Sequence, residues 1–265
     1  MDVTIIIPTH NQNKELLSKI ENTISKQKFD GKVKVIKVAG MGLADSLNHG
    51  IKNSKTELVV SLHQDCIPSS DYWLKNLIEP LKEKEVVASV SKVELPKEFF
   101  EKFGFLAKIF SIKEQKILTP LMDEKGCAYK KESIEKAGFF DGKTFRTAGE
   151  DFDMYLKLSK LGKIAYPKAK VYHYHKHTFK NRLKKELQLS EGFGALVRKY
   201  GRQMPGWYKG LIKSIPIAGW PFFLLNFPYT RMFFGGIAWI FLSLVVNLIY
   251  FVGFWKGFLT GRQRV

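Results

Sequence analysis

Asp65 follows a short apolar run and is the first candidate for chemistry in this chain. The run Leu58–Leu62 is rich in Leu and Val, which predicts a buried strand, and His63, Gln64 and Asp65 follow it directly. Ligands bind beyond the carboxyl ends of strands in open α/β sheets, so this carboxylate could meet a metal ion or a phosphate-bearing ligand. Alternatively, Asp65 caps a turn before Pro68, a position that Asp favours.

Three further carboxylates, those of Glu150, Asp151 and Asp153, open a predicted helix that ends at Gly162. Acidic side chains are favoured at a helix N-terminus, because the helix dipole is positive there. The dipole accounts for one or two of these acids but less well for all three. At least one of them is therefore a candidate for chemistry.

His173, His175 and His177 alternate along a predicted strand. Alternate residues of a strand share a face, so the three imidazoles would point the same way. They could bind zinc. Alternatively, one or two of them contact a phosphate or complete a metal shell begun by Asp65. For His177, a solvated position at a polar strand end is a further alternative.

Apolar periodicity predicts the elements that must position these residues. The β-branched run that stops at Pro8 is a first strand, Asn13 can cap the helix that follows, and Asn48 lies one turn into a second helix, facing the strand ends. Strand, helix, strand, helix, strand is the pattern of a parallel sheet with right-handed crossovers. Further strands are predicted over residues 86–92, 126–129, 163–166 and 169–174. Trp73 is predicted to be a core residue. The basic, aromatic insertion 94–117 could be core, a wall on the acceptor side, or a membrane-touching face.

Composition limits the class of partner. With 265 residues and 45% apolar side chains, the chain can form one medium α/β domain plus an appendage. The presence of only two cysteines argues against a disulfide framework and fits a reducing compartment. The formal net charge of +18 indicates an anionic partner: nucleic acid, a phosphorylated substrate or a membrane surface. The basic residues gather beside the apolar tail, and no sequence motif for nucleic-acid binding is present, so we expect no nucleic-acid partner.

The last third of the chain is predicted to meet a membrane. Residues 178–213 are rich in Lys and Arg, and residues 232–255 contain no charged side chain. Roughly 20 apolar residues span a bilayer core, so the second run is long enough to cross, although a buried core helix is the alternative. Aromatic residues suited to the interface belts lie at both ends of it: Phe233, Phe234, Phe254 and Trp255.

Residues 214–230 are also uncharged, but Pro216, Pro221 and Pro228 interrupt them. This segment could be an interfacial or re-entrant helix, or the first arm of a helical hairpin. Basic clusters on both sides of the apolar region favour a membrane protein whose main domain is on the cytoplasmic side.

Three stretches resemble glycosyltransferase family 2, the inverting nucleotide-sugar enzymes with a GT-A fold. They are TIIIPTHNQ, GLADSLNHGIKNSKTELVVSLHQD and KGCAYKKESIEKAGFFDGKTFRTAGEDFDMYLKLSKLGKIAYPKAKVYHYH. They occur in family order over about two-thirds of the chain, and QDCIPSSDYWLKNL and VYHYH are most similar to the rhamnosyltransferase-like branch. The resemblance implies an α/β fold with a mostly parallel sheet flanked by helices, to which the sequence adds a C-terminal membrane helix or hairpin. We expect a GT-A domain over 1–177, a basic juxtamembrane segment over 178–213 and a membrane segment over 214–265.

The resemblance also implies roles for individual residues. Asp65 would be the surviving acid of the family's Asp-x-Asp motif and would hold a divalent metal, Mn or Mg, on the donor diphosphate; His63 stands where the first Asp usually sits. Asp151, in the Glu150-Asp151 pair, would be the general base. The residues expected to bind the donor are Pro8, Thr9, Asn11, Asn48, His63, Gln64 and Asp65, and those expected at the diphosphate or metal shell are His173 and His175.

These expectations combine into one predicted function. The chain would be a membrane-anchored enzyme, a hexosyl- or deoxyhexosyltransferase, that moves a sugar with inversion from a nucleotide-sugar donor. Its acceptor would be a saccharide, which could be lipid-linked, as in polysaccharide or glycolipid biosynthesis. The alternative is a catalytically inactive GT-A-like protein that binds a membrane surface, and His63 in place of an Asp is the observation that favours it.

Overall fold

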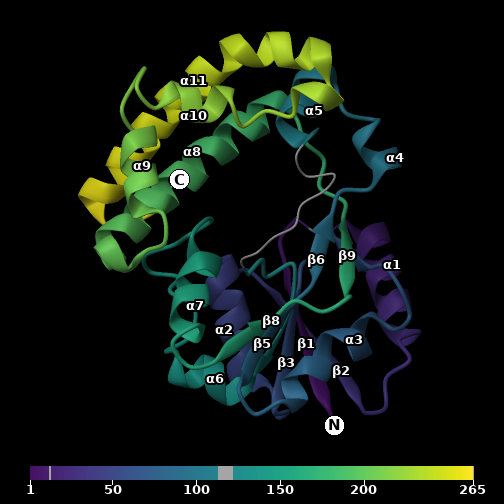
Figure 1. The fold of residues 1–265 in the computed structure, drawn as a ribbon. Helices are drawn as coiled ribbons and strands as arrows, with labels where there is room; N and C mark the ends of the chain where they lie inside the picture. The colour runs from purple at the N-terminus through teal and green to yellow at the C-terminus, as the bar shows by residue number, and fades with distance from the viewer. Residues whose placement is uncertain (12, 113–121, 265) are drawn as a thin grey trace. The chain divides into compact units, whose positions relative to one another are not determined.

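The structure, a computed structural model, describes residues 1–11, 13–112 and 122–264, which form two compact units (Figure 1). The sheet unit comprises residues 1–96, 116–142 and 151–175, and the helical unit comprises 97–115, 143–150 and 176–265. The sheet unit ends two residues before the boundary expected at residue 177. The helical unit also takes in two segments from within the expected 1–177 domain. The last residues of the 94–117 insertion, from 113 on, lie outside the described residues.

A six-stranded, mostly parallel sheet forms the centre of the sheet unit. The strand order is β2-β1-β3-β7-β5-β8, in which only β7 runs antiparallel to its neighbours. The strand β1 is rich in Ile and the strand β3 in Val and Leu, and both are buried on both faces, as expected of a sheet with helices on either side. Their bounds are β1 Val3–Thr9, β2 Val33–Ala39, β3 Leu58–Leu62, β5 Val86–Val90, β7 Gly126–Lys130 and β8 Lys163–Ala165.

Helices cover this sheet, and an apolar cluster lies under them on each side. Their bounds are α1 Lys14–Ser25, α2 Leu43–Asn53, α3 Trp73–Ile78, η1 Glu79–Lys82, α6 Lys131–Lys136 and α7 Glu150–Leu158. The Asn13 side chain caps α1 by accepting a hydrogen bond from the Leu16 amide at 3.2 Å. Trp73 is fully buried, as predicted, and its indole N–H donates to Ser91 Oγ. The fold is therefore the expected α/β arrangement.

A second, three-stranded sheet brings distant segments together and corrects two sequence predictions. It consists of β4 (Cys66–Pro68), β9 (Lys170–His173) and β6 (Lys92–Glu94) in the order β4-β9-β6. The single strand predicted over 86–92 is divided between β5 and β6, which belong to different sheets. The strand predicted over 169–174 ends at His173, before the other two histidines.

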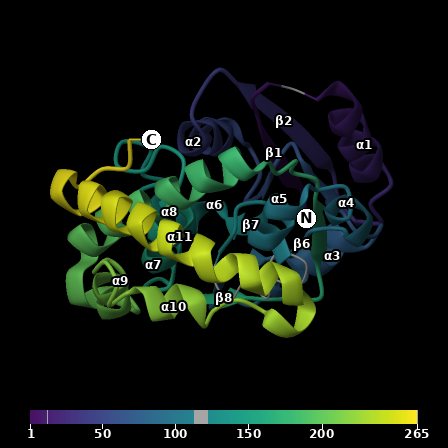
Figure 2. The same cartoon turned by 90° about the horizontal axis from the view of Figure 1, so that it is seen from above.

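The helical unit is built on two long helices, α8 (Phe179–Tyr200) and α11 (Phe233–Thr260), which pack side by side (Figure 2). Among the described residues, α11 alone is long and apolar enough to cross a membrane, judged by length and composition. Phe254, one of the aromatic residues expected to suit a membrane interface belt, is buried within the unit. The shorter helices are α4 Lys97–Phe100, α5 Phe105–Ser111, η3 Gly201–Gln203, α9 Trp207–Lys213, α10 Trp220–Leu224 and η4 Tyr229–Arg231.

Residues 214–231 contain only the short helices α10 and η4, neither of which is long enough to be the first arm of a hairpin. The prolines explain the interruption, since each one removes a backbone donor and disfavours helix in the residue before it. At the end of the chain, the buried Gln263 side chain accepts hydrogen bonds from the amides of Arg146 (2.9 Å) and Thr147 (2.7 Å). It also donates to Thr147 Oγ1 at 2.9 Å.

Candidate functional site

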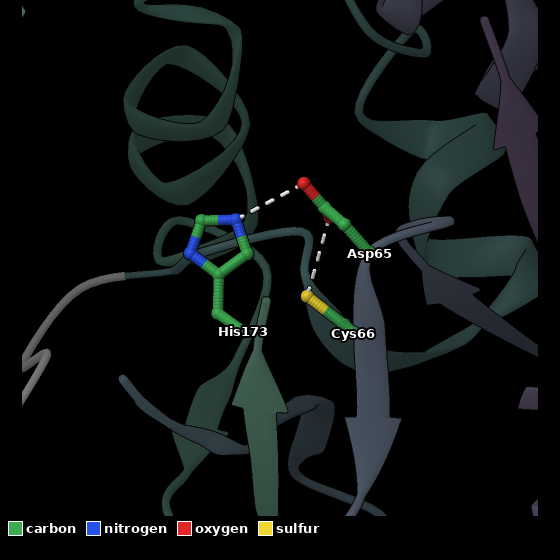
Figure 3. Close-up of side chains that lie close together, drawn as sticks. All are labelled: Asp65, Cys66 and His173. Carbon is green, nitrogen blue, oxygen red and sulfur yellow. Dashed lines mark hydrogen bonds and ion pairs between the residues drawn. The ribbon is translucent and has the colours of Figure 1, made fainter. Parts of the chain in front are cut away.

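The Asp65 carboxylate faces two imidazoles at the point where β3 has ended and β4 begins (Figure 3 shows one of them, His173). Its Oδ2 atom lies 3.3 Å from His173 Nε2 and 3.1 Å from His175 Nδ1. The antiparallel pairing of β4 with β9 sets Cys66 opposite His173, and the Tyr174 amide donates to the Asp65 carbonyl. Backbone pairing thus fixes both histidines on a carboxylate more than a hundred residues away in sequence.

Hydrogen bonds keep the Asp65 carboxylate ionised. Burial alone would raise its pKa, but the hydrogen bonds from His173 and His175 outweigh burial and hold the pKa well below its usual range. The Cys66 thiol lies 3.7 Å from Asp65 Oδ1, and burial raises its pKa, so the sulfur keeps its proton. Ligand atoms of Asp65, Cys66 and His173 all lie within 4.8 Å of one another, a group that could hold a metal ion.

His177 does not continue this row. Strand β9 ends at His173, so the alternation that would place three imidazoles on one face stops there. The His177 ring is buried in the helical unit, where it packs edge-on against Phe103 with ring centroids 5.3 Å apart. His177 is therefore neither solvated nor part of the group around Asp65, and it has a packing role. His173 and His175 contact Asp65.

His63 directly follows β3 and lies two residues before Asp65. Its Nε2 atom is shielded from solvent and has no hydrogen-bond partner among the described residues. Burial is the main cause that lowers the pKa of His63 to about 4, and the nearby Lys125 adds to it. The imidazole is therefore neutral near pH 7.

Asp123 and Lys125 join the same group of charges, and sequence reasoning missed both. The Lys125 ammonium lies 2.8 and 2.9 Å from the two Asp123 carboxylate oxygens, and both side chains are largely buried. Burial alone would lower the pKa of Lys125, but Asp123, with smaller contributions from Cys66 and Asp151, raises it above its ordinary value. The available signal was an Asp-x-Lys sequence directly before the strand that begins at Gly126.

The three acids of α7 have different surroundings. Glu150 and Asp153 are buried, and Asp153 forms an ion pair with Lys157 at 2.7 Å. Asp151 is only half-buried, and its Oδ1 atom accepts a hydrogen bond from the Phe152 amide. Asp151 is therefore the most solvent-accessible of the three acids.

Pro8 and Thr9 are the last residues of β1, which runs past the end predicted at Pro8, and Asn11 lies in the loop that follows. The buried Thr9 hydroxyl donates to the Val38 carbonyl at 3.1 Å and so holds the ends of β1 and β2 together. Asn11 adopts φ +47°, a left-handed conformation that Asn tolerates. The Gln64 side-chain amide pairs with both the amide and the carbonyl of His10. Gln64 therefore connects the loops after β1 and β3.

Asn48 is occupied elsewhere in the sheet unit. Its side chain donates to the Phe140 carbonyl and accepts from the Phe140 amide, each at 2.9 Å. This pair of hydrogen bonds fixes the turn after α6 against helix α2. The expected donor-binding role of Asn48 remains a prediction, and the observed contacts favour a structural role.

Together these side chains offer an ionised carboxylate beside imidazole nitrogens, a largely buried cation, and a second, partly open carboxylate. Such a set can bind a cation with the anion that accompanies it and can accept a proton nearby.

Residues 17–138 match the family model for glycosyl transferase family 2. This match includes Asp65, Asp123 and Lys125, whereas Asp151 and the two site histidines lie beyond it. No curated protein was found to match the chain by sequence.

Two solved structures are similar in fold to most of this chain. One is a mannosyltransferase, PcManGT from Pyrobaculum calidifontis, in complex with GDP-Man and Mn2+, with 17% identity and a TM-score of 0.65 over 96% of this chain and 86% of that one. Another is GalNAc-T7 with UDP, GalNAc and Mn2+, with 14% identity and a TM-score of 0.57 over 82% of this chain and 50% of that one. At these identities the likeness establishes an α/β fold of the GT-A type.

Proposed function

We propose that the chain is a membrane-associated glycosyltransferase that moves a sugar, with inversion, from a nucleotide-sugar donor to a saccharide acceptor. The observation that carries the proposal is the Asp65 carboxylate held by His173 and His175 beyond the carboxyl end of β3. Ligands bind at this edge of open α/β sheets. The match of residues 17–138 to family 2 supports a glycosyltransferase, and the family membership of the whole chain is part of the proposal.

A divalent metal fits the residues present. Carboxylate oxygen with imidazole nitrogen is a donor set for Mn2+, and the protonated Cys66 thiol is a poor competitor for it. Asp65, His173 and His175 would hold the metal, and the unpartnered His63 nitrogen lies at the position of the missing first Asp. When bound, Mn2+ or Mg2+ would neutralise charge on the departing diphosphate. Both structural relatives contain Mn2+ with a nucleotide, which supports this assignment.

Asp151 would act as the general base. It would take the proton of the acceptor hydroxyl while that oxygen forms the new bond to the anomeric carbon and the bond to the diphosphate oxygen breaks. Attack opposite the leaving group inverts the anomeric centre. Glu150, expected at the catalytic pair, is buried and would position the start of α7 instead of exchanging a proton.

The remaining residues would shape the donor pocket. Pro8, Thr9 and Asn11 would line the nucleotide, with Gln64 holding the loop after β1 through the His10 backbone. The Lys125 ammonium would add positive charge beside the diphosphate, with Asp123 fixing its place. The apolar helix α11 motivates a lipid-linked acceptor at the cytoplasmic face.

The catalytically inactive alternative has one observation in its favour, His63 where the family usually has Asp. The two functions differ in a measurable way. A panel of GDP- and UDP-sugars is tested as donors. The enzyme would hydrolyse or transfer the sugar of one of them in a Mn2+-dependent manner, whereas the inactive protein would do neither.

The decisive variant is Asp151→Asn, which keeps the shape of the side chain and removes its basicity. We expect sugar transfer to fall by at least a factor on the order of 100, because general-base catalysis contributes about that much, while donor binding is retained. Glu132→Gln is the matched control, since Glu132 is an exposed acid in the first turn of α6. Transfer at the parental rate by Asp151→Asn would remove Asp151 from the mechanism.

A further inference from the structure

Helix α11 has an apolar face that nothing in the described structure covers. Only 33% of its most apolar stretch is buried within the structure. Large exposed side chains recur at helical spacing along this face, namely Ile237, Phe241, Leu244, Leu248, Val252 and Leu259. An exposed apolar stripe of this length requires a partner.

The opposite face of α11 carries the small and polar residues, and these are used within the helical unit. Asn247 donates to the Lys213 carbonyl at 2.9 Å and accepts from the Ile217 amide at 3.2 Å. The Trp220 indole donates to Ser243 Oγ at 2.7 Å. The middle of α11 is therefore hydrogen-bonded to the irregular backbone between α9 and α10.

Helix α8 runs along α11 and is strongly charged (Figure 2). Lys256 of α11 forms an ion pair with the buried Glu191 of α8 at 3.0 Å. At the end of α11, Arg198 donates to the carbonyls of Phe258 and Leu259 at 2.9 and 2.8 Å. These contacts fix α11 to a helix that cannot enter hydrocarbon without carrying its lysines and arginines along.

A spanning orientation conflicts with both sets of contacts. It would place the middle of α11 at the bilayer centre, together with the non-helical backbone around Ile217 and much of α8. Backbone groups without intrahelical partners are not tolerated where lipid surrounds them. Only the exposed stripe is free of such attachments.

We propose that α11 lies in the plane of the membrane, with its stripe embedded in one leaflet and α8 on the water side, so that the chain is a monotopic protein. The partner is an anionic bilayer, because residues 176–265 contain fourteen Lys and Arg against two acidic residues. Anionic lipid attracts such a surface, while the apolar stripe supplies the insertion. The inference does not depend on sugar transfer.

Depth measurements at three sites distinguish the two orientations. Ile237, Leu248 and Leu259 are exposed and follow one another at intervals of eleven residues, so they share a face. The outer two are about 33 Å apart along the helix, close to the thickness of a bilayer core of about 30 Å. Each is replaced by Cys in the full-length protein and spin-labelled; the native Cys66 and Cys127 are buried.

The labelled proteins are bound to vesicles of phosphatidylcholine and phosphatidylglycerol, and depth is read from the ratio of oxygen to nickel-chelate relaxation. We expect three similar, shallow depths. A label at residue 248 that is far deeper than the other two, with labels at 237 and 259 near opposite surfaces, would show a spanning helix and overturn the proposal. Labels that never reach lipid would also overturn it.

A charge in the stripe provides an independent test. Leu248→Glu should weaken partitioning to these vesicles on the order of tenfold or more, because a charged group resists insertion. Leu161→Glu, at a comparably exposed leucine of the sheet unit, should leave binding unchanged. Circular dichroism checks folding. If Leu248→Glu binds vesicles normally but converts a dimer to a monomer in light scattering, the stripe is an interface between copies and the proposal fails.

Discussion

Asp65 illustrates how a residue's surroundings decide its chemistry. Alone, an Asp before a proline-containing turn is ambiguous between a turn cap and a ligand. In the structure, two imidazoles meet one of its oxygens and keep the carboxyl ionised despite burial. In a turn cap the carboxylate would bond to backbone amides, whereas here it contacts two imidazoles, a type of side chain that itself binds metals.

Replacing Asp65 by Asn tests the metal role. The amide keeps the size of the side chain but loses the negative charge, so we expect Mn2+ to stop raising the apparent melting temperature in the presence of nucleotide. A ligand that binds only the folded state stabilises it, so this loss reports loss of binding. Asp71→Asn, at an exposed position, is the control and should retain the Mn2+ response. A full response in Asp65→Asn would place the metal elsewhere.

The Asp123–Lys125 pair should be coupled energetically. Lys125→Met or Asp123→Asn leaves the remaining group without its partner in a largely buried place, and we expect each to cost about 1–3 kcal/mol of unfolding free energy. The double variant should cost less than the sum of the two, because neither charge is then left behind. Urea unfolding of the four proteins measures this. Strict additivity would show that the pair contributes nothing jointly.

At this scale the sequence supports Asp65, His173 and His175 as one group, through the resemblance and their alternation. It could not reveal Asp123 and Lys125, since a charged pair before a strand is common and their importance comes from the distant His63 and Asp151. His177 shares the alternation but not the strand, because β9 ends first.

At the scale of elements, local patterns predict the strands and helices better than their partners. Strands β1, β2 and β3 lie where the periodicity places them, but β4 is not among the predicted strands. Residues 86–92 are predicted as one strand and belong to two sheets. No residue in that run signals the change, since Ser91 and Lys92 suit a continuous strand equally well. The division is determined by pairing with Gly126 and with residues 169–170, which local sequence cannot indicate.

Asn48 allows a test of a structural role at this scale. Asn48→Ala would leave the Phe140 amide and carbonyl without their partners, and we expect a loss of about 1–3 kcal/mol in unfolding free energy. Asn53→Ala, in the same helix but exposed, should cost less. Nucleotide affinity of the folded Asn48→Ala protein should be nearly unchanged. A large fall in affinity at unchanged stability would restore the donor-binding role expected from the sequence.

At the scale of the whole molecule, hydropathy identifies α11 but not what it packs against. A charge-free run predicts a membrane helix. The glycines on the face of α11 that packs against α8 indicate close helix packing only when the position of α8 is known. A Cβ atom at Gly257 would collide with the Glu191 carbonyl and the Ala195 amide, both backbone atoms that cannot rotate away.

Gly257→Ala therefore sets two effects against each other. Ala favours a helix over Gly by about 1 kcal/mol, but a clash with backbone costs about 1–3 kcal/mol, so we expect net destabilisation. Leu259→Ala, on the exposed face of the same helix, should change stability little. Thermal unfolding in detergent compares them. A stabilised Gly257→Ala protein would show that α8 and α11 pack less closely than described.

The attachment of Gln263 to Arg146 and Thr147 has a practical outcome for anyone who produces this protein. Thr147 lies three residues before Glu150 and four before Asp151. An affinity tag fused after residue 265, or a truncation that removes residues 261–265, would therefore disturb the segment that leads to the proposed base. Low turnover in such a preparation would reflect the altered terminus. Purification handles belong at the other terminus, before Met1.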